Sequence, residues 1–223
     1  MEFKIAASPS SYLILHMSEG EQIIAESGTF IFSDGLYTVS SKFELKSYKN
    51  WLAKLFGGKS LIYKIYRAQE SLQLMLSVKD NAELFLVEVE ADNSIIFTPG
   101  LHFARTELVN LHFHKRDWNS TINDGFKLKT SGSGKLFLKG YGKIILKEID
   151  TEDLVYVDET ALIAFEDRLS VKTISKGMKE LLTSGEGFIY GISGKGRIWI
   201  QTREKGLSSG GGGFISDVLT SVT

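Results

Sequence analysis

Hydrophobic and polar residues alternate along most of this chain with the period of two that is typical of β-strands with one buried face. This pattern predicts strands at 61–66, 72–78, 84–89, 95–97, 108–114, 126–130, 135–139, 143–149, 154–157, 161–165, 187–192 and 196–202. Residues 28–40 place Ser33-Asp34-Gly35 between two alternating runs, which predicts a hairpin. Strands this closely spaced predict a sandwich, a barrel or a β-helix-like roll.

Helical patterns are few. Residues 48–56 give the clearest one, with Asn50 as a candidate cap and Gly57-Gly58 as the end. Residues 174–182 form a weaker candidate, and the last dozen residues could form a short third helix. We therefore expect an all-β protein with one or two short helices.

Similar segments recur along the chain. Residues 96–104 and 156–164 both read as strand, turn, strand, ending in alanine, and they lie sixty residues apart. The recurrence predicts a duplication, with a first β unit at 1–105 and a second at 106–205, packed as one compact pair. A Gly-rich segment at 206–223 follows, either flexible or docked on a neighbouring subunit.

Several of these segments resemble a known family. They are residues 132–142, residues 162–166 and the ending Gly-x-Gly-x-Ile-Trp-x-Gln-Thr at 194–202. With residues 55–63 and Thr98-Pro99-Gly100, they resemble the altered-inheritance-of-mitochondria family over about 19–205. The turn at 158–160 departs from the family, which often has Pro-Gly there.

The resemblance implies a fold similar to the tryptophan RNA-binding attenuation protein. Such a fold consists of short double-stranded β-helix or β-sandwich units, duplicated within the chain. Proteins with this fold assemble into rings or trimers. The resemblance implies no known catalytic activity. In fungi the family is tied to organisation of the mitochondrial inner membrane.

Composition narrows the function classes. The chain has no cysteine, which excludes a disulfide framework and thiolate catalysis. A net charge of −1 gives no reason to expect a nucleic-acid partner. The sequence shows neither an apolar run long enough to span a membrane nor a signal peptide, so we expect a cytoplasmic protein. The 22 glycines with 2 prolines indicate many tight turns.

Three histidines, His102, His112 and His114, offer a candidate metal site. His112 and His114 would share one face of a strand, as in cupins. However, Lys115-Arg116-Asp117 follow instead of the glutamate that a cupin needs, and His16 is the remaining histidine. We therefore predict no metal and no other cofactor, and keep a cupin-like small-ligand protein as an alternative.

The glycine pairs at 132–134 and 185–187 resemble phosphate loops superficially. A phosphate loop needs a helix N-terminus after the glycines, whereas both pairs lead into alternating strand residues. We interpret them as turns or β-bulges. No catalytic constellation stands out in the sequence, so we expect a protein that is not an enzyme.

Residues 42–64 carry six lysines and one glutamate among aromatic and aliphatic side chains. An amphipathic helix packed on the sheet explains this pattern. Alternatively, Trp51, Lys54, Leu55 and Phe56 could contact a protein partner or an anionic membrane surface.

Two further segments indicate assembly. Residues 148–167 contain eight acidic residues and no basic one, so they could meet the basic segment of another copy head to tail. Phe214, Ile215, Val218 and Leu219 form an apolar stripe that could dock on a neighbour. We therefore predict a self-assembling scaffold or partner-binding protein, most simply a homotrimer, with an unknown protein partner or a peripheral membrane role as further alternatives.

Overall fold

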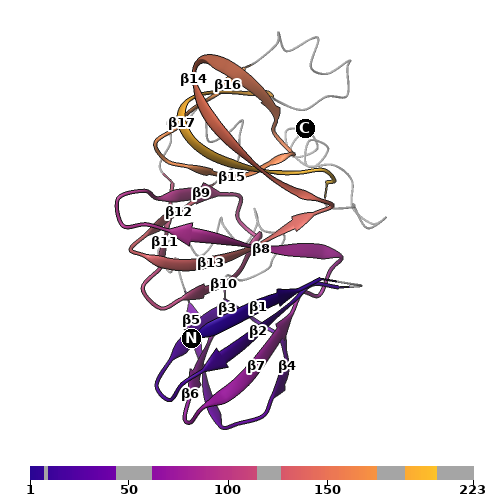
Figure 1. Cartoon of the computed structure of the whole chain (residues 1–223), viewed down its shortest axis with the longest axis vertical. Coiled ribbons are helices and arrows are strands. Elements are labelled where there is room, and N and C mark those ends of the chain that lie inside the picture. Colours follow the sequence, from indigo (N-terminus) through magenta and orange to yellow (C-terminus); the bar gives the residue numbers. More distant parts are fainter. Residues whose placement is uncertain (8–9, 44–61, 115–126, 175–188, 205–223) are drawn as a thin grey trace, which may run out of the picture.

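The computed structural model describes residues 1–7, 10–43, 62–114, 127–174 and 189–204. Every regular element within these ranges is a β-strand, which confirms the predicted all-β class. The strands form three antiparallel sheets stacked along the long axis of the molecule (Figure 1). The helices predicted at 48–56, at 174–182 and near the C-terminus fall mainly or wholly outside the described residues, and Ile174 itself ends a strand.

The first sheet contains, in spatial order, β1 (Glu2–Ala6), β2 (Tyr12–Met17), β7 (Leu72–Ser77) and β4 (Phe30–Ser33). The middle sheet contains β5 (Tyr37–Phe43), β6 (Ile62–Ala68), β3 (Gln22–Glu26), β10 (His102–Thr106), β13 (Gly134–Tyr141) and β8 (Ala82–Val89). The third contains β11 (Asn110–Phe113), β12 (Leu128–Ser131), β9 (Ile95–Phe97), β15 (Leu162–Glu166), β17 (Ile189–Gln201) and β14 (Ile144–Asp158), with β16 (Ser170–Ile174) beside β17.

Strand pairing follows one pattern three times. In unit 1 (12–77), β3 and β5 flank β6, while β2 and β4 flank β7. Unit 2 (82–141) repeats this with β8 to β13. Unit 3 (144–201) repeats it again, except that β14 serves as the first two strands and β17 as the last two. The structure therefore contains one more copy of the unit than the predicted duplication.

The same hydrogen bond recurs in each unit, which fixes the alignment of the three copies. At the end of the bulged strand, a side-chain oxygen accepts a backbone N–H from the neighbouring strand. The three pairs are Asp34 with Gln73 at 2.5 Å, Thr106 with Lys135 at 2.9 Å and Glu166 with Arg197 at 3.1 Å. These equivalences place 30–32, 102–104 and 162–164 at the same position of the unit, and likewise 23–25, 95–97 and 155–157.

Two joints connect the units, and both are strand pairs. At the first joint β3 pairs with β10, so that Ala25 lies opposite Ala104. At the second, β9 pairs with β15 in the same register, with Phe97 opposite Ala164. Each joint thereby merges half-sheets of two units into one continuous sheet.

The core has three parts that follow from this stacking. One cluster fills the space between the first and middle sheets, around Leu13, Leu74 and Phe103. A second lies between the middle and third sheets, around Val87, Phe97 and Trp199. The third lies within the curled third sheet, around Phe165 and Ile192. The middle sheet is therefore covered on both faces, and consecutive residues of β3, β10 and β13 are buried.

Two details of the sequence prediction change. The predicted hairpin at 28–40 is wrong, because β4 pairs with β7 in the first sheet and β5 pairs with β6 in the middle sheet. The turn at Gly35 carries the chain from one sheet to the next. The boundary predicted between residues 105 and 106 lies inside β10, and the division into domains stays a prediction.

Candidate functional site

Strand β4 forms an exposed apolar edge at one end of the molecule (Figure 1). Phe30, Ile31 and Phe32 expose 40%, 54% and 44% of their surface, although three consecutive large apolar residues are ordinarily buried. Among the described strands, β4 pairs with β7 alone. Its other edge therefore offers unpaired backbone groups beside apolar side chains. We call residues 30–33 the head edge.

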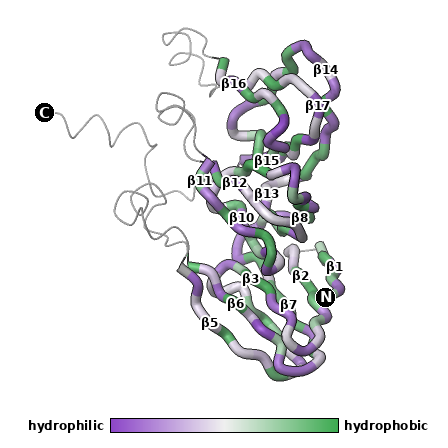
Figure 2. The backbone as a smooth tube through the Cα atoms, turned by 90° about the vertical axis from the view of Figure 1, so that its left-hand side faces the viewer, coloured by the Kyte–Doolittle hydropathy of each residue, from purple (hydrophilic) through white to green (hydrophobic). Residues whose placement is uncertain are grey.

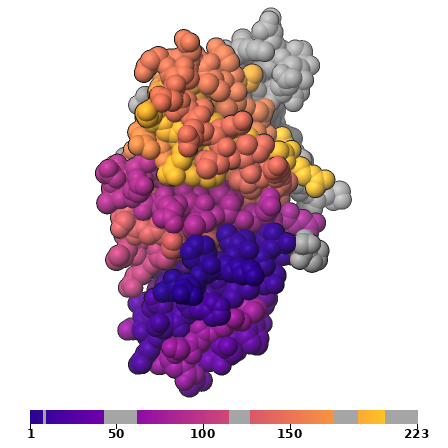
Figure 3. Space-filling model, in the orientation of Figure 1, coloured from indigo at the N-terminus to yellow at the C-terminus, as the bar shows by residue number. Residues whose placement is uncertain are grey.

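A second exposed edge lies at the opposite end, in the last part of β14 (Figure 1). Val155 and Tyr156 expose 37% and 63% of their surface. Residues 155–158 pair with β17 on one side and, within the described part of the chain, with no strand on the other. We call residues 155–158 the tail edge. The space-filling view places unit 1, coloured indigo to magenta, toward one end of the long axis and the orange β14 region toward the other (Figure 3).

Both edges lie where the described residues place no neighbouring unit. The residues of units 2 and 3 that are equivalent to the head edge are all buried: His102, Phe103, Ala104, Leu162, Ile163 and Ala164. The residues equivalent to Val155 and Tyr156 are buried too: Ile23, Ile24, Ile95 and Ile96. The fold thus exposes at its two ends the apolar positions that it buries at its two internal joints.

One carboxylate near each edge accepts hydrogen bonds from its own chain. At the head edge, Asp34 accepts the backbone N–H of Gln73 at 2.5 Å. At the tail edge, Asp158 accepts the backbone N–H of Thr160 at 2.8 Å and its hydroxyl at 2.5 Å. A partner that covered either edge would therefore mainly displace water from apolar side chains, which is favourable.

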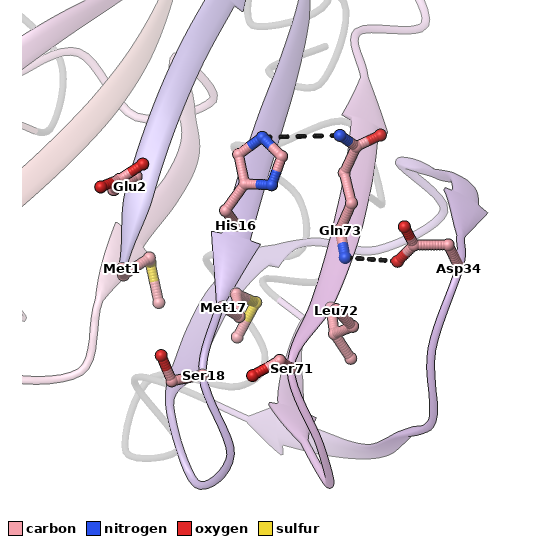
Figure 4. A pocket seen from close by; sticks show the side chains of 9 residues that line it. All are labelled: Met1, Glu2, His16, Met17, Ser18, Asp34, Ser71, Leu72 and Gln73. Atoms are coloured by element: carbon pink, nitrogen blue, oxygen red, sulfur yellow. Dashed lines mark hydrogen bonds between the residues drawn. The ribbon is translucent and has the colours of Figure 1, made fainter.

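A hollow of about 450 Å³ lies beside the head edge on the first sheet (Figure 4). Its lining comprises Met1, Glu2, His16, Met17, Ser18, Asp34, Ser71, Leu72 and Gln73. The His16 ring nitrogen lies 3.5 Å from the Gln73 side-chain amide, and Asp34 is held by the Gln73 backbone. These contacts pair no nucleophile with a base among the lining residues, and they give the hollow no evident chemistry.

His102, the first of the three candidate histidines, lies fully buried on β10. Arg105 Nη1 lies 3.1 Å from His102 Nε2, and the guanidinium also lies over the Tyr63 ring. Because a guanidinium can only donate, His102 accepts at Nε2. Burial lowers the pKa of His102 well below its usual value, and the charges of Arg105 and Lys139 lower it further. This environment disfavours a second cation.

The structure does not bring the three candidate histidines together. His102 belongs to the middle sheet, whereas His112 lies exposed in the third sheet, where its Nε2 contacts the Ser131 hydroxyl at 2.7 Å. His114 follows β11 and is half-buried. Within the described ranges, no three histidine or acidic side chains are grouped to hold a metal ion.

Glu166 is a fully buried carboxylate that the sequence reasoning did not single out. Arg197 Nε donates to it at 2.5 Å, and Arg168 Nη2 lies 2.6 Å away. Burial alone would raise the pKa of Glu166, but the hydrogen bonds from Arg197 and Arg168 outweigh it and lower that pKa. Glu166 also performs the recurring backbone capping described above, so its role is structural.

The other predicted contact residues lie outside the described part of the chain. These are Trp51, Lys54, Leu55 and Phe56 for the partner or membrane contact, and Phe214, Ile215, Val218 and Leu219 for assembly. Figure 2 shows β5, β11 and β16 along one side of the molecule, and residues 44–61, 115–126 and 175–188 follow these three strands in the sequence. No helix in the described ranges is long and apolar enough to cross a membrane.

Sequence reasoning missed the two edges, although a signal was present. The repeat of 96–104 at 156–164 extends to 24–32, where Gly28 occupies the place of Gly100. Both glycines have positive φ, 80° and 84°. Aligning the three segments shows that the large apolar residues at 30–32 are equivalent to residues that the other two units bury at the internal joints.

Three repeated units with exposed apolar strand edges at both ends define the described part of this chain as a modular all-β protein. Residues 3–203 match the family model described as mitochondrial biogenesis AIM24, and the chain belongs to that family. It is similar to the crystal structure of protein SPYM3_0169 from Streptococcus pyogenes, with a TM-score of 0.72, 15% identity, and coverage of 99% of this chain and 97% of that one. No curated protein matches the sequence.

Proposed function

We propose that this protein is a non-enzymatic, self-assembling scaffold that acts by forming homo-oligomers. The observation that carries the proposal is the exposure of Phe30, Ile31, Phe32 and Tyr156 at two ends of a chain that buries every equivalent position. Contiguous exposed apolar residues on an unpaired strand edge are a liability that proteins normally cover. Assembly covers both edges and leaves the sides of the stack available for a partner.

A homotrimer is one closed form of such an assembly, because a contact between two different surfaces closes into a ring when its rotation divides a full turn. The acidic β14 region supports a contact between unlike surfaces, since it would repel a second copy of itself. The cytoplasmic location and the absence of catalysis stay predictions.

Sedimentation velocity over a micromolar concentration series tests this proposal directly. We expect the full chain to sediment as an oligomer that dissociates on dilution. A monomer at every concentration, for the full chain without a tag, would refute self-assembly.

A further inference from the structure

We infer that the head edge of one copy pairs with the tail edge of the next, so that residues 32–34 and 155–157 form a third, intermolecular joint in one antiparallel register. This inference rests on the proposed self-assembly and specifies its contact. It follows from the way in which the chain already joins its own units.

The internal joints define what each edge requires. At both joints the strand that follows the turn of one unit, β10 or β15, pairs with the short strand of the preceding unit, β3 or β9. In unit 1 the equivalent of β10 is β4, and the described part of the chain places no other unit beside it. In unit 3 the equivalent of β3 is residues 155–158, which likewise meet no further unit among the described residues. The two unpaired edges are therefore the two halves of one joint.

The register follows from the same equivalence. Ala104 lies opposite Ala25, and Ala164 lies opposite Phe97. The corresponding residues at the ends are Phe32 and Val157. The next pairs at the internal joints, Arg105 with Ile24 and Phe165 with Ile96, correspond to Ser33 and Tyr156.

The half-sheets at the two ends of the molecule correspond to the two halves of the middle sheet. The middle sheet joins β5, β6 and β3 of unit 1 to β10, β13 and β8 of unit 2. At the head end, β4, β7 and β2 form half of such a sheet. At the tail end, the other half consists of β16, residues 189–192 of β17 and residues 155–158 of β14. Pairing β4 with β14 of another copy would make one continuous sheet of the same order.

Apolar burial favours this occupant over an unrelated one. Ile31 and Tyr156 are equivalent to Phe103 and Ile24, which are buried at the first joint. That joint is also bridged by an ion pair of 2.6 Å between Lys139 and Glu26. A second copy supplies both the strand and the apolar side chains that these positions meet inside the chain. Because the two edges lie at opposite ends of the molecule, the contact joins different copies (Figure 1).

Cysteine cross-linking tests the pairing and its register, since the chain contains no cysteine. Directly opposed residues of antiparallel strands have Cα atoms about 4.5–5.5 Å apart, within the range of a disulfide. Ser33→Cys and Tyr156→Cys would be purified separately as full chains, mixed and oxidised under mild conditions. We expect a disulfide-linked dimer in the mixture and little in either variant alone. Asp158→Cys, two residues along the same strand, serves as the register control and should link more weakly to Ser33→Cys.

The outcomes separate this inference from the proposed function. Failure of the wild-type chain to oligomerise at any concentration would overturn both. An oligomer that gives no Ser33–Tyr156 link, or in which Ser33→Cys links efficiently to itself, would overturn the strand pairing and leave self-assembly standing. Loss of the oligomer on deletion of 207–223, with no cross-link in the full chain, would likewise overturn the pairing and assign the contact to the C-terminal segment.

Discussion

Replacing Ile31 with aspartate should dissociate the oligomer while leaving each copy folded. Ile31 is 54% exposed in the single chain, so the substitution removes little of the packing that holds the monomer. Its equivalents Phe103 and Ile163 are buried at the internal joints, so an assembled copy would have to bury the new carboxylate without a counterion.

The free energy of assembly that Ile31→Asp removes has two contributions. Fully burying an isoleucine contributes about 1.5–3 kcal/mol, so the half that is still exposed contributes about 1 kcal/mol to assembly. Burying an unpaired carboxylate adds several kcal/mol of lost hydration, even after partial relaxation. A combined loss of at least about 3 kcal/mol weakens the contact by more than 100-fold.

Sedimentation velocity and thermal unfolding of Ile31→Asp measure the two sides of this prediction. Leu108→Asp is the matched control, because Leu108 is 69% exposed but lies in the turn between β10 and β11, away from both edges. The reasoning is refuted if Ile31→Asp keeps the wild-type mass at micromolar concentration, or if Leu108→Asp dissociates the oligomer equally well.

Three further predictions concern the fold. The pKa of His102 is near 6.5 in the unfolded chain and lower in the folded chain, so below pH 6.5 the unfolded chain binds one more proton. As the pH is lowered from 6.5, the free energy of unfolding should therefore fall by about 1 kcal/mol per pH unit. Denaturant titrations of His102→Gln should lack this pH dependence. Glu166→Gln should cost about 2 kcal/mol at neutral pH, and less as the pH drops through the lowered pKa of Glu166, where the wild-type carboxylate loses its own contribution. Gly132→Ala places a Cβ 2.0 Å from a backbone oxygen at φ +84° and should lower the free energy of unfolding by about 3 kcal/mol or more. Gly100→Ala, at the same φ but with open space around it, should lower it by about 1–2 kcal/mol. Equal melting temperatures for the two variants would contradict this.

Much of the fold follows from the sequence because alternation reports strands directly. The strands predicted between 61 and 202 lie close to those observed, and the repeat of 96–104 at 156–164 marks equivalent strands β9–β10 and β14–β15. The pairing of the strands could not be predicted from the sequence, because periodicity shows which face of a strand is buried but not which strand lies beside it. The segment at 28–40 illustrates this, because β4 and β5 are adjacent in sequence and belong to different sheets.

The candidate site was harder to predict for a related reason. His102 reads as a ligand when it is counted with His112 and His114, yet its neighbours in space are Arg105 and Tyr63. Likewise, Phe30 to Phe32 read as ordinary core residues of an inner strand. Their exposure becomes evident once the described residues are seen to form three units, in which the first and the last strand edge pair with no other described strand.

The most direct test of head-to-tail assembly is to mix two variants that are each defective at a different edge. Ile31→Asp keeps an intact tail edge, and Tyr156→Asp, which changes a residue equivalent to buried Ile24, keeps an intact head edge. We predict that each variant alone sediments as a monomer and that an equimolar mixture forms a one-to-one dimer. A mixture that stays monomeric, or single variants that retain the wild-type mass, would contradict the account.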